Sequence, residues 1–236
     1  TMRFFHPKFS NKVDAVVGVS QYILDHHLNH GYFRDSQIKS VIHNVRNNKQ
    51  ALKAARQDSD STFNLGFIGT LDKSKGIEIL LDAFKRVAKN NWRLYIAGRG
   101  LAQYEKFLHD TNNEANIIFL GVQNPEVFYP QIDVLVVPSI WNDTLPGVVF
   151  EGMSYGIPII GARRGGIPEM IEDGVNGMLF DPSKPQQLEG AMMYMAENAE
   201  FRASVSVAAR YSTSYYLDIG RFISSYEGIY RDITRK

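Results

Sequence analysis

Short apolar runs, most of them ending on a glycine or a proline, recur through the middle of the sequence and alternate with longer amphipathic stretches. Continuous apolar runs that are rich in β-branched residues are typical of strands buried on both faces. Amphipathic stretches between such runs are typical of helices that pack on the sheet. The sequence therefore predicts an α/β fold with a parallel sheet and helices on both of its faces. The predicted strands are 64–69, 92–98, 116–121, 133–138, 157–162 and, with a weaker signal, 177–180.

The overall composition excludes several classes of function. Lys and Arg number 26 and Asp and Glu number 25, so the formal net charge of +1 gives no general attraction to nucleic acid or anionic lipid. The chain has no cysteine, which excludes disulfides, thiol nucleophiles and thiolate metal sites and fits a reducing compartment. Its apolar runs are far shorter than the roughly 20 residues of a membrane-spanning helix. Any anion-binding site must therefore be local.

The first 45 residues read as a separate segment. A strand is predicted over 13–19, with Ser20 as the N-cap of a helix that runs to about Asn29. A second short strand is predicted over 40–45. The polar stretch 46–62 that follows has the composition of a linker, so we place a domain boundary there.

The C-terminal part of the chain, residues 185–236, has helical periodicity throughout. Phe222, Tyr226 and Tyr230 recur at a spacing of four residues, which predicts that they lie along one helix face.

Four of the predicted strands end on Gly69, Gly98, Gly121 and Pro138. Ligands of parallel α/β sheets bind outside the carboxyl ends of the strands, so we expect the loops after these residues to border one crevice. Each glycine alone is explained equally well by a turn, and it is their succession that indicates a site.

Lys75 lies at the start of the predicted helix after the first of these strands, where backbone N–H groups already favour an anion. Its positive charge would suit a phosphate, and the alternative is a solvated lysine in a polar turn. The glycines at 98–100 do not complete a dinucleotide motif, because Gln103 occupies the place of the third glycine.

The most specific stretch places Asp143 and Glu151 eight positions apart around Pro146, which is expected to begin a helix. Carboxylates accept pairs of hydrogen bonds from vicinal hydroxyls, such as those of a sugar ring or a ribose. The N–H groups of Gly147 and Val148 at the helix start would suit a phosphate. The alternative is a capping acid followed by an exposed glutamate. The apolar neighbours of Glu151 argue against it, because a buried charge requires a partner.

Four linked motifs stand in order here: DTLPGVVFE, GMSYGIPII, GGIPE and DGVNGML. On these motifs the chain resembles the C-terminal, donor-binding domain of a GT-B glycosyltransferase of the large retaining family four, the group 1 glycosyl transferases. The resemblance implies a Rossmann-like parallel sheet with helices on both faces, as in the C-terminal half of a GT-B fold, together with a remnant of the N-terminal domain. It also implies that Glu151 binds the ribose hydroxyls of a sugar nucleotide, that Asp143 binds the donor sugar and that Lys75 contacts the diphosphate.

Three positions depart from the family pattern. Asp143 is one methylene shorter than the usual Glu, and Pro146 replaces the usual Gly. Thr70 stands where the family commonly has an Arg that contacts the diphosphate. The loss of this cation is expected to weaken diphosphate binding unless another basic residue substitutes for it. The candidates for that substitution are Arg99, Arg163 and Arg164.

The predicted catalytic residues are thus Lys75, Asp143 and Glu151. No metal is expected, because His26 and His30 share a helix face without an evident third ligand and the family's chemistry needs none. The nucleotide base is expected to meet the backbone around Gly121 and Val122. The predicted donor-binding positions are Gly69, Thr70, Gly98, Gly121, Val122, Thr144, Leu145, Pro146, Gly147 and Val148.

The resemblance also divides the chain into parts. Residues 1–45 are expected to be the end of an N-terminal acceptor domain, and residues 46–62 the linker. Residues 63–195 are expected to form the nucleotide-sugar donor-binding domain, and residues 196–236 to be C-terminal helices that pack back toward the N-terminal domain.

The implied function is retaining transfer of a sugar, of the hexosyl type, from a nucleoside-diphosphate sugar to an acceptor hydroxyl, with this chain as the donor-binding half. The alternatives are a nucleotide-sugar binding module without turnover and a GT-B epimerase. No cofactor is expected beyond the sugar nucleotide, which is the substrate. The expected partners are that donor and a glycan or lipid-linked acceptor held by an N-terminal domain that this sequence lacks, and nucleic acid is not expected. The expected setting is glycan or polysaccharide biosynthesis in the cytoplasm, with peripheral association at the inner face of a membrane left open.

Overall fold

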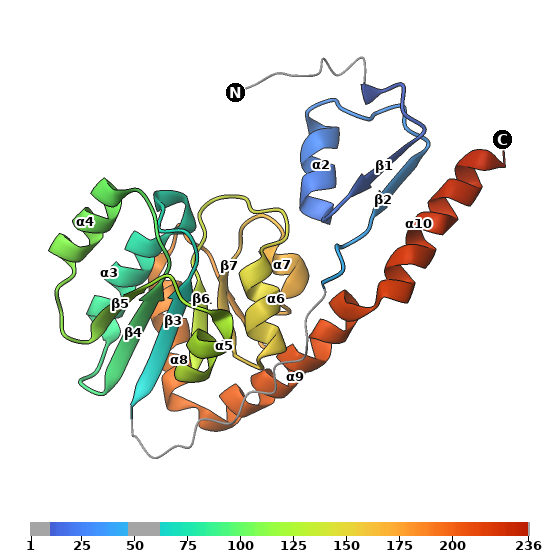
Figure 1. The fold of residues 1–236 in the computed structure, drawn as a ribbon. Coiled ribbons are helices and arrows are strands. Elements are labelled where there is room, and N and C mark those ends of the chain that lie inside the picture. Colours follow the sequence, from blue (N-terminus) through green and yellow to red (C-terminus); the bar gives the residue numbers. More distant parts are fainter. Residues whose placement is uncertain (1–9, 47–61, 236) are drawn as a thin grey trace. The chain divides into compact units, whose positions relative to one another are not determined.

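The computed structural model describes residues 10–46 and 62–235 (Figure 1). Nearly all of the predicted linker, residues 46–62, lies outside the described residues. The chain divides into two compact units, one formed by residues 48–213 and the other by residues 1–47 together with 214–236. The final helix therefore groups with the N-terminal segment and not with the larger unit.

The larger unit is built on a six-stranded sheet in which every pair of neighbouring strands is parallel. The strand order is β5-β4-β3-β6-β7-β8. The predicted α/β class with a parallel sheet is confirmed, and each predicted strand is present within two residues at either end. The strands are β3 (Phe63–Ile68), β4 (Trp92–Ala97), β5 (Ile117–Gly121), β6 (Val134–Val137), β7 (Ile159–Ala162) and β8 (Met178–Phe180).

Helices cover both faces of this sheet. Gly66, Leu135 and Ile159 are cross-strand neighbours, so they point to the same face. The segment that carries α5 packs on Gly66 through Ile132, and α6 packs on Leu135 through Gly152. Figure 1 shows α5 and α6 on this side of the sheet and α8, which packs against α3, on the other.

The helices and single turns of the larger unit have these bounds: η1 (Lys73–Lys75), α3 (Ile77–Val87), α4 (Ala102–Thr111), α5 (Pro125–Phe128), η2 (Tyr129–Gln131), α6 (Gly147–Ser154), α7 (Ile167–Met170), α8 (Pro185–Glu197) and α9 (Ala199–Leu217). The last of these extends past residue 213 into the smaller unit.

The core lies where the helices meet the sheet. On α3 the apolar positions Ile77, Leu80 and Phe84 recur at helical spacing and are fully buried. They pack over strands whose own side chains, such as Leu65 and Leu94, are also fully buried. Each such side chain contributes about 1.5–3 kcal/mol of burial free energy, which fixes the position of the strand ends and their loops.

The helical periodicity predicted for residues 185–236 is interrupted twice. α8 ends at Glu197 and is capped by Asn198, whose side chain donates to the carbonyl of Tyr194 at 2.8 Å. α10 (Ile219–Thr234) begins after Asp218, whose carboxylate accepts from the N–H of Arg221 at 2.8 Å. Local side-chain caps of this kind end one helix and start the next.

The smaller unit contains a two-stranded parallel sheet of β1 (Ala15–Gly18) and β2 (Ile38–Val41). In the sequence, α2 (Gln21–Asn29) connects these two strands, and α10 belongs to the same unit. The predicted N-cap is confirmed, because Ser20 accepts from the N–H of Ile23 at 3.3 Å.

The strand predicted over 40–45 is wrong in its bounds. β2 begins two residues earlier and ends four residues earlier, because Ile38 pairs with Ala15 and Val41 with Gly18, where β1 ends. Beyond it, His43 stacks on Tyr216 instead of continuing the sheet.

The strand order places a topological switch between β3 and β6. From β3 the chain continues through α3 to β4 on one side, and from β6 it continues through α6 to β7 on the other. The connections therefore diverge and leave a crevice at the carboxyl ends of these two strands, the position where open α/β sheets bind ligands.

Candidate functional site

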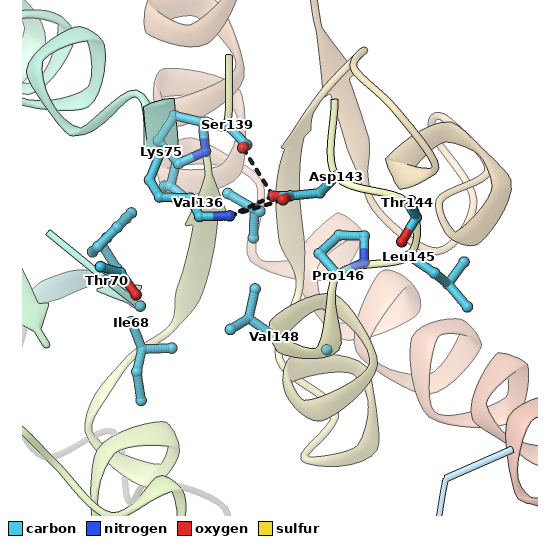
Figure 2. Close-up of a pocket in the computed structure, with 15 residues that line it drawn as sticks. Ile68, Thr70, Lys75, Val136, Ser139, Asp143, Thr144, Leu145, Pro146 and Val148 are labelled. Atoms are coloured by element: carbon cyan, nitrogen blue, oxygen red, sulfur yellow. Dashed lines mark hydrogen bonds and ion pairs between the residues drawn. The ribbon is translucent and has the colours of Figure 1, made fainter. Parts of the chain in front are cut away.

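A cavity of about 350 Å³ lies at this switch point (Figure 2). The carboxyl ends of β3 and β6 form its floor, and the loop before α6 and the turn before α3 form its walls. It gathers nine of the predicted site residues: Gly69, Thr70, Lys75, Asp143, Thr144, Leu145, Pro146, Gly147 and Val148.

Lys75 is delivered to the cavity by the 3-10 turn η1. The carboxylate of Asp72 accepts from the N–H of Ser74 at 2.8 Å, and the carbonyl of Asp72 accepts from the N–H of Lys75 at 3.0 Å. Lys75 was predicted at the start of the helix, but it lies in this turn, and α3 begins two residues later. Gly76 between them has φ +70°, and a Cβ there would lie 1.9 Å from the carbonyl oxygen of Pro138. The turn can therefore approach the β6 loop only because residue 76 is glycine.

Asp143 faces Lys75 across the cavity (Figure 2). The Lys75 ammonium donates to both oxygens of the Asp143 carboxylate, at 2.9 and 2.7 Å. The hydroxyl of Ser139 donates to Oδ2 of the same carboxylate at 3.1 Å. The two charged side chains are only 32% and 21% exposed, respectively, so solvent screens this pair less than an open surface pair. The cavity thus contains a fixed ion pair between residues 68 positions apart.

Backbone hydrogen bonds hold the two walls together. The carbonyl of Ser74 accepts from the N–H groups of Ile140 and Trp141, both at 2.9 Å. These bonds join the Lys75 turn to the Asp143 loop directly. Neither loop can therefore move independently of the other without breaking them.

The glycine pair of the GGIPE motif packs against the backbone of Asp143. The N–H of Gly166 donates to the carbonyl of Asp143 at 2.8 Å. A Cβ on Gly165, which has φ +55°, would lie 2.1 Å from that same carbonyl oxygen. Sequence reasoning named this motif but not its structural role, which is close backbone approach to the Asp143 loop.

The start of α6 forms the remaining wall. The helix begins at Gly147 after Pro146, and no side chain caps it. First-turn N–H groups of a helix have no partner within the helix and carry its positive dipole end. Since Gly147 and Val148 line the cavity, its chemistry combines a lysine, a carboxylate and helix-start amides.

Glu151 does not line this cavity, although it lies one turn further along α6. It is partly buried, and its Oε2 accepts from the hydroxyl of Tyr129 at 3.3 Å. Burial, and secondarily the charge and hydrogen bond of Glu151, raises the pKa of the Tyr129 phenol well above its usual value. Tyr129 therefore remains a neutral donor to the carboxylate. No sequence signal distinguished it from an ordinary core aromatic.

A second cavity, of about 330 Å³, lies at the carboxyl ends of β4 and β5. It is lined by two predicted positions, Gly98 and Gly121, whereas Val122 is 67% exposed and lines neither cavity. The wall between the cavities is a close backbone contact, since a Cβ on Gly98 would lie 1.8 Å from the carbonyl oxygen of Gly69. The two cavities thus follow one another along the same edge of the sheet.

Comparison with known proteins identifies the family. A family model described as glycosyl transferases group 1 matches residues 48–211. The chain belongs to this family.

Curated relatives of this group 1 glycosyl transferase are also named as glycosyltransferases. An uncharacterized glycosyltransferase of Methanocaldococcus jannaschii is 32% identical over 209 residues, which cover 86% of this chain and 55% of the relative. D-inositol 3-phosphate glycosyltransferase of Corynebacterium kroppenstedtii is 27% identical over 188 residues, covering 73% of this chain and 41% of the relative. The chain therefore spans about half the length of these curated relatives. The crystal structure of Anabaena HepE in complex with UDP-glucose shares the GT-B fold, with a TM-score of 0.78 at 23% identity, over 98% of this chain and 66% of that one.

The basic residues proposed to substitute for an arginine at position 70 differ in their surroundings. Arg163 forms an ion pair with Asp173. Hydrogen bonds from Ser183 are the main cause that holds the pKa of the Asp181 carboxyl below its usual value, and the charges of Lys184 and then of Arg164 add to it. Arg99 lines the second cavity of this family member.

Neither a metal cluster nor a membrane span is found in the described part of the chain. Its histidines and carboxylates nowhere gather in a group of three that could hold a metal ion. The rings of His26 and His30 are 4.4 Å apart, and Nδ1 of His30 lies 2.6 Å from the carbonyl oxygen of His26. None of the described helices combines the length and the apolar character that crossing a bilayer requires.

Proposed function

We propose that this chain is the donor-binding half of a glycosyltransferase that moves a sugar from a nucleoside-diphosphate sugar to an acceptor hydroxyl with retention. The observation that carries the proposal is the Lys75–Asp143 pair, in a cavity between the carboxyl ends of β3 and β6 beside an uncapped helix start. These groups match the two ends of a sugar diphosphate. The lysine ammonium and the helix-start amides suit the diphosphate, and the carboxylate suits the sugar hydroxyls.

In this proposal Lys75 and the amides of Gly147 and Val148 bind the diphosphate. Negative charge accumulates on the diphosphate as the bond to the sugar breaks, so these fixed donors stabilise the transition state more than the bound donor. Asp143 accepts hydrogen bonds from the sugar and holds the anomeric carbon toward the acceptor. We propose that this charge stabilisation needs no metal, and adding EDTA should then leave nucleotide affinity unchanged.

The nucleoside end of the donor would extend toward the second cavity. Glycine backbone at Gly98 and Gly121 gives a flat base close access to main-chain groups. We assign the ribose hydroxyls to Glu151, which Tyr129 orients, and the base to the backbone around Gly121 and Val122. The complex of HepE with UDP-glucose supports a uridine donor as the first one to test.

The acceptor would be bound outside the sequence described here. Since the chain spans about half of its curated relatives, we propose that a glycan or lipid-linked acceptor is held by an N-terminal domain that closes over the donor crevice. We expect the reaction to take place in the cytoplasm, with any membrane attachment residing in that domain. By itself the chain should bind nucleotide and transfer little sugar.

Titration calorimetry with UDP, GDP and ADP tests the donor site. One nucleotide should bind, and Lys75→Ala should weaken it about tenfold or more, because a charge-assisted contact with the diphosphate is lost. Lys73→Ala is the matched control, since Lys73 is an exposed lysine of the same turn that does not line the cavity. The proposal fails if none of the three nucleotides binds, or if both lysine variants lose affinity equally.

A second candidate, a nucleotide-sugar binding module without turnover, is favoured by one observation. Thr70 lines the cavity and brings no positive charge, so leaving-group stabilisation rests on fewer cations. Mixing the chain with the N-terminal domain of a relative separates the two candidates. Sugar transfer that appears in the mixture favours the enzyme, and nucleotide binding without transfer favours the module.

A further inference from the structure

The first cavity is electrically balanced before any ligand enters. Among the described residues that line it, Lys75 and Asp143 are the only charged side chains. They neutralise one another through a bidentate contact at 2.9 and 2.7 Å, and Thr70 across from them is neutral. A nucleoside diphosphate carries several negative charges, so a single paired lysine with two helix-start amides leaves part of that charge uncompensated.

Arg99 is a cation in the neighbouring cavity that is not committed elsewhere. It is exposed, it lines the second cavity, and its guanidinium makes no hydrogen bond or ion pair with any residue that the structure describes. Glu105, the one carboxylate among the described residues that line that cavity, is held by another group, because its Oε1 accepts from the N–H of Gly100 at 2.6 Å.

The backbone places Arg99 directly beside the wall that carries Thr70. The carbonyl of Arg99 accepts from the N–H of Leu71 at 2.8 Å, and Leu71 pairs with Gly100 as an isolated parallel bridge. Together with the contact between Gly98 and Gly69, this bridge fixes the loop after β4 against the loop after β3. A side chain as long as arginine starts here at the boundary between the two cavities.

We propose that Arg99 binds the phosphate of the nucleoside diphosphate nearest the ribose, and so supplies the positive charge that Thr70 lacks. The inference rests on the proposed function, because it requires the nucleotide to lie across both cavities. A guanidinium suits this place because its planar fork can donate two hydrogen bonds to one phosphate while its stem covers the boundary. Arg99 is thus a donor-binding residue contributed by the second cavity to the diphosphate site of the first.

Affinities for UDP and for uridine, measured on Arg99→Ala, test the assignment. UDP should bind about tenfold more weakly than to the wild-type chain, whereas uridine, which has no phosphate, should bind within about twofold of wild type. Arg99→Lys should keep part of the UDP affinity, because it preserves the charge but not the fork. If another base binds more tightly, its own diphosphate and nucleoside are used in the same way.

The matched control is Arg93→Ala, which removes an exposed arginine from the opposite end of the same strand and should leave both affinities unchanged. Thr70→Arg introduced into the Arg99→Ala chain should recover the UDP affinity to within about threefold of wild type. The same substitution in the wild-type chain should raise the UDP affinity by a smaller factor. An equal gain in both backgrounds would contradict the compensation.

The remaining outcomes are equally decisive. Unchanged UDP affinity in Arg99→Ala overturns the assignment, and so does an equal loss for UDP and uridine, which would place Arg99 on the nucleoside. A wild-type chain that binds no nucleotide at all would instead refute the proposed function, so the two failures are distinguishable. Since Arg99 is exposed, thermal unfolding of the variant should match that of the wild-type chain.

Discussion

At the scale of single residues, the candidate site depends on partners that are distant in the sequence. Lys75 is held by Asp143, and Asp143 is held by Ser139 and by the N–H of Gly166. Each of these groups restrains the next, so the ammonium is presented to a ligand at a fixed place. A lysine that reaches a cavity without such restraint would lose more side-chain entropy on binding.

Ser139→Ala tests this chain of contacts. Ser139 is 2% exposed, and its hydroxyl donates to Asp143 Oδ2 at 3.1 Å, so its loss should lower the free energy of unfolding by about 1 kcal/mol. It should also weaken UDP binding several-fold, because Asp143 and with it Lys75 become less restrained. Ser206→Ala is the control, since that hydroxyl donates to the carbonyl of Gly156 and lines neither cavity. Chemical denaturation and calorimetry measure both effects. Equal UDP affinity in the two variants would contradict a positioning role for Ser139.

At the scale of elements, the turn between η1 and α3 determines whether the site forms. Gly76→Ala should destabilise the protein by about 2–4 kcal/mol, since it adds a strained φ and places Cβ on the carbonyl of Pro138. Gly174→Ala separates the two causes, because Gly174 has φ +79° but nothing within 4 Å of its Cβ position. It should cost only about 1 kcal/mol, from strain alone. Similar losses in both variants, measured by denaturant unfolding, would show that the contact with Pro138 is unimportant.

The helix α2 should respond to pH through His27. Burial, followed by the charges of His26 and His30, lowers the pKa of His27 below its ordinary value of 6.5. The unfolded chain then binds the proton more readily, so the stability of this unit is full above about pH 6.5 and falls as the pH falls through the folded-state pKa. The change in stability with pH should be small because His27 is largely exposed.

An NMR titration of the His27 ring should give a midpoint below 6.5. In the double variant His26→Gln, His30→Gln, the midpoint of the His27 titration should rise but stay below 6.5, because the burial of His27 remains. A wild-type midpoint at or above 6.5 would contradict this account.

The strands of the larger unit could be predicted because most of them bury an apolar run and are followed by a glycine or a proline. β2 was displaced because its bounds are set by pairing with β1, which a single strand's sequence does not encode. The loops after β3 and β6 could likewise be located from the sequence, since strand ends and a helix start are local signals. The contact between Lys75 and Asp143 spans 68 positions, and the hydrogen bond between Tyr129 and Glu151 spans 22. Such pairs follow from the strand order, which only the folded sheet reveals.

At the scale of the whole molecule, the chain combines a larger unit, to which we assign donor binding, with a smaller unit made from its two ends. Residues 214–236 group with residues 1–47, so the C-terminal helix belongs to the unit that the N-terminal segment begins. In a two-domain transferase, a helix that returns in this way would link the donor-binding half to the acceptor half. We therefore expect the chain alone to turn over a nucleotide sugar much more slowly than a mixture that includes the acceptor half.

The central claim is that the crevice between β3 and β6 holds a nucleotide sugar through Lys75. The measurement that tests it most directly is a crystal structure of the chain with UDP-glucose, or with the sugar nucleotide of whichever base binds most tightly. The account predicts diphosphate oxygens within hydrogen-bond distance of the Lys75 ammonium and of the N–H groups of Gly147 and Val148, with the sugar against Asp143. A nucleotide bound away from this cavity, or bound within it while the diphosphate leaves Lys75 untouched, would contradict the account.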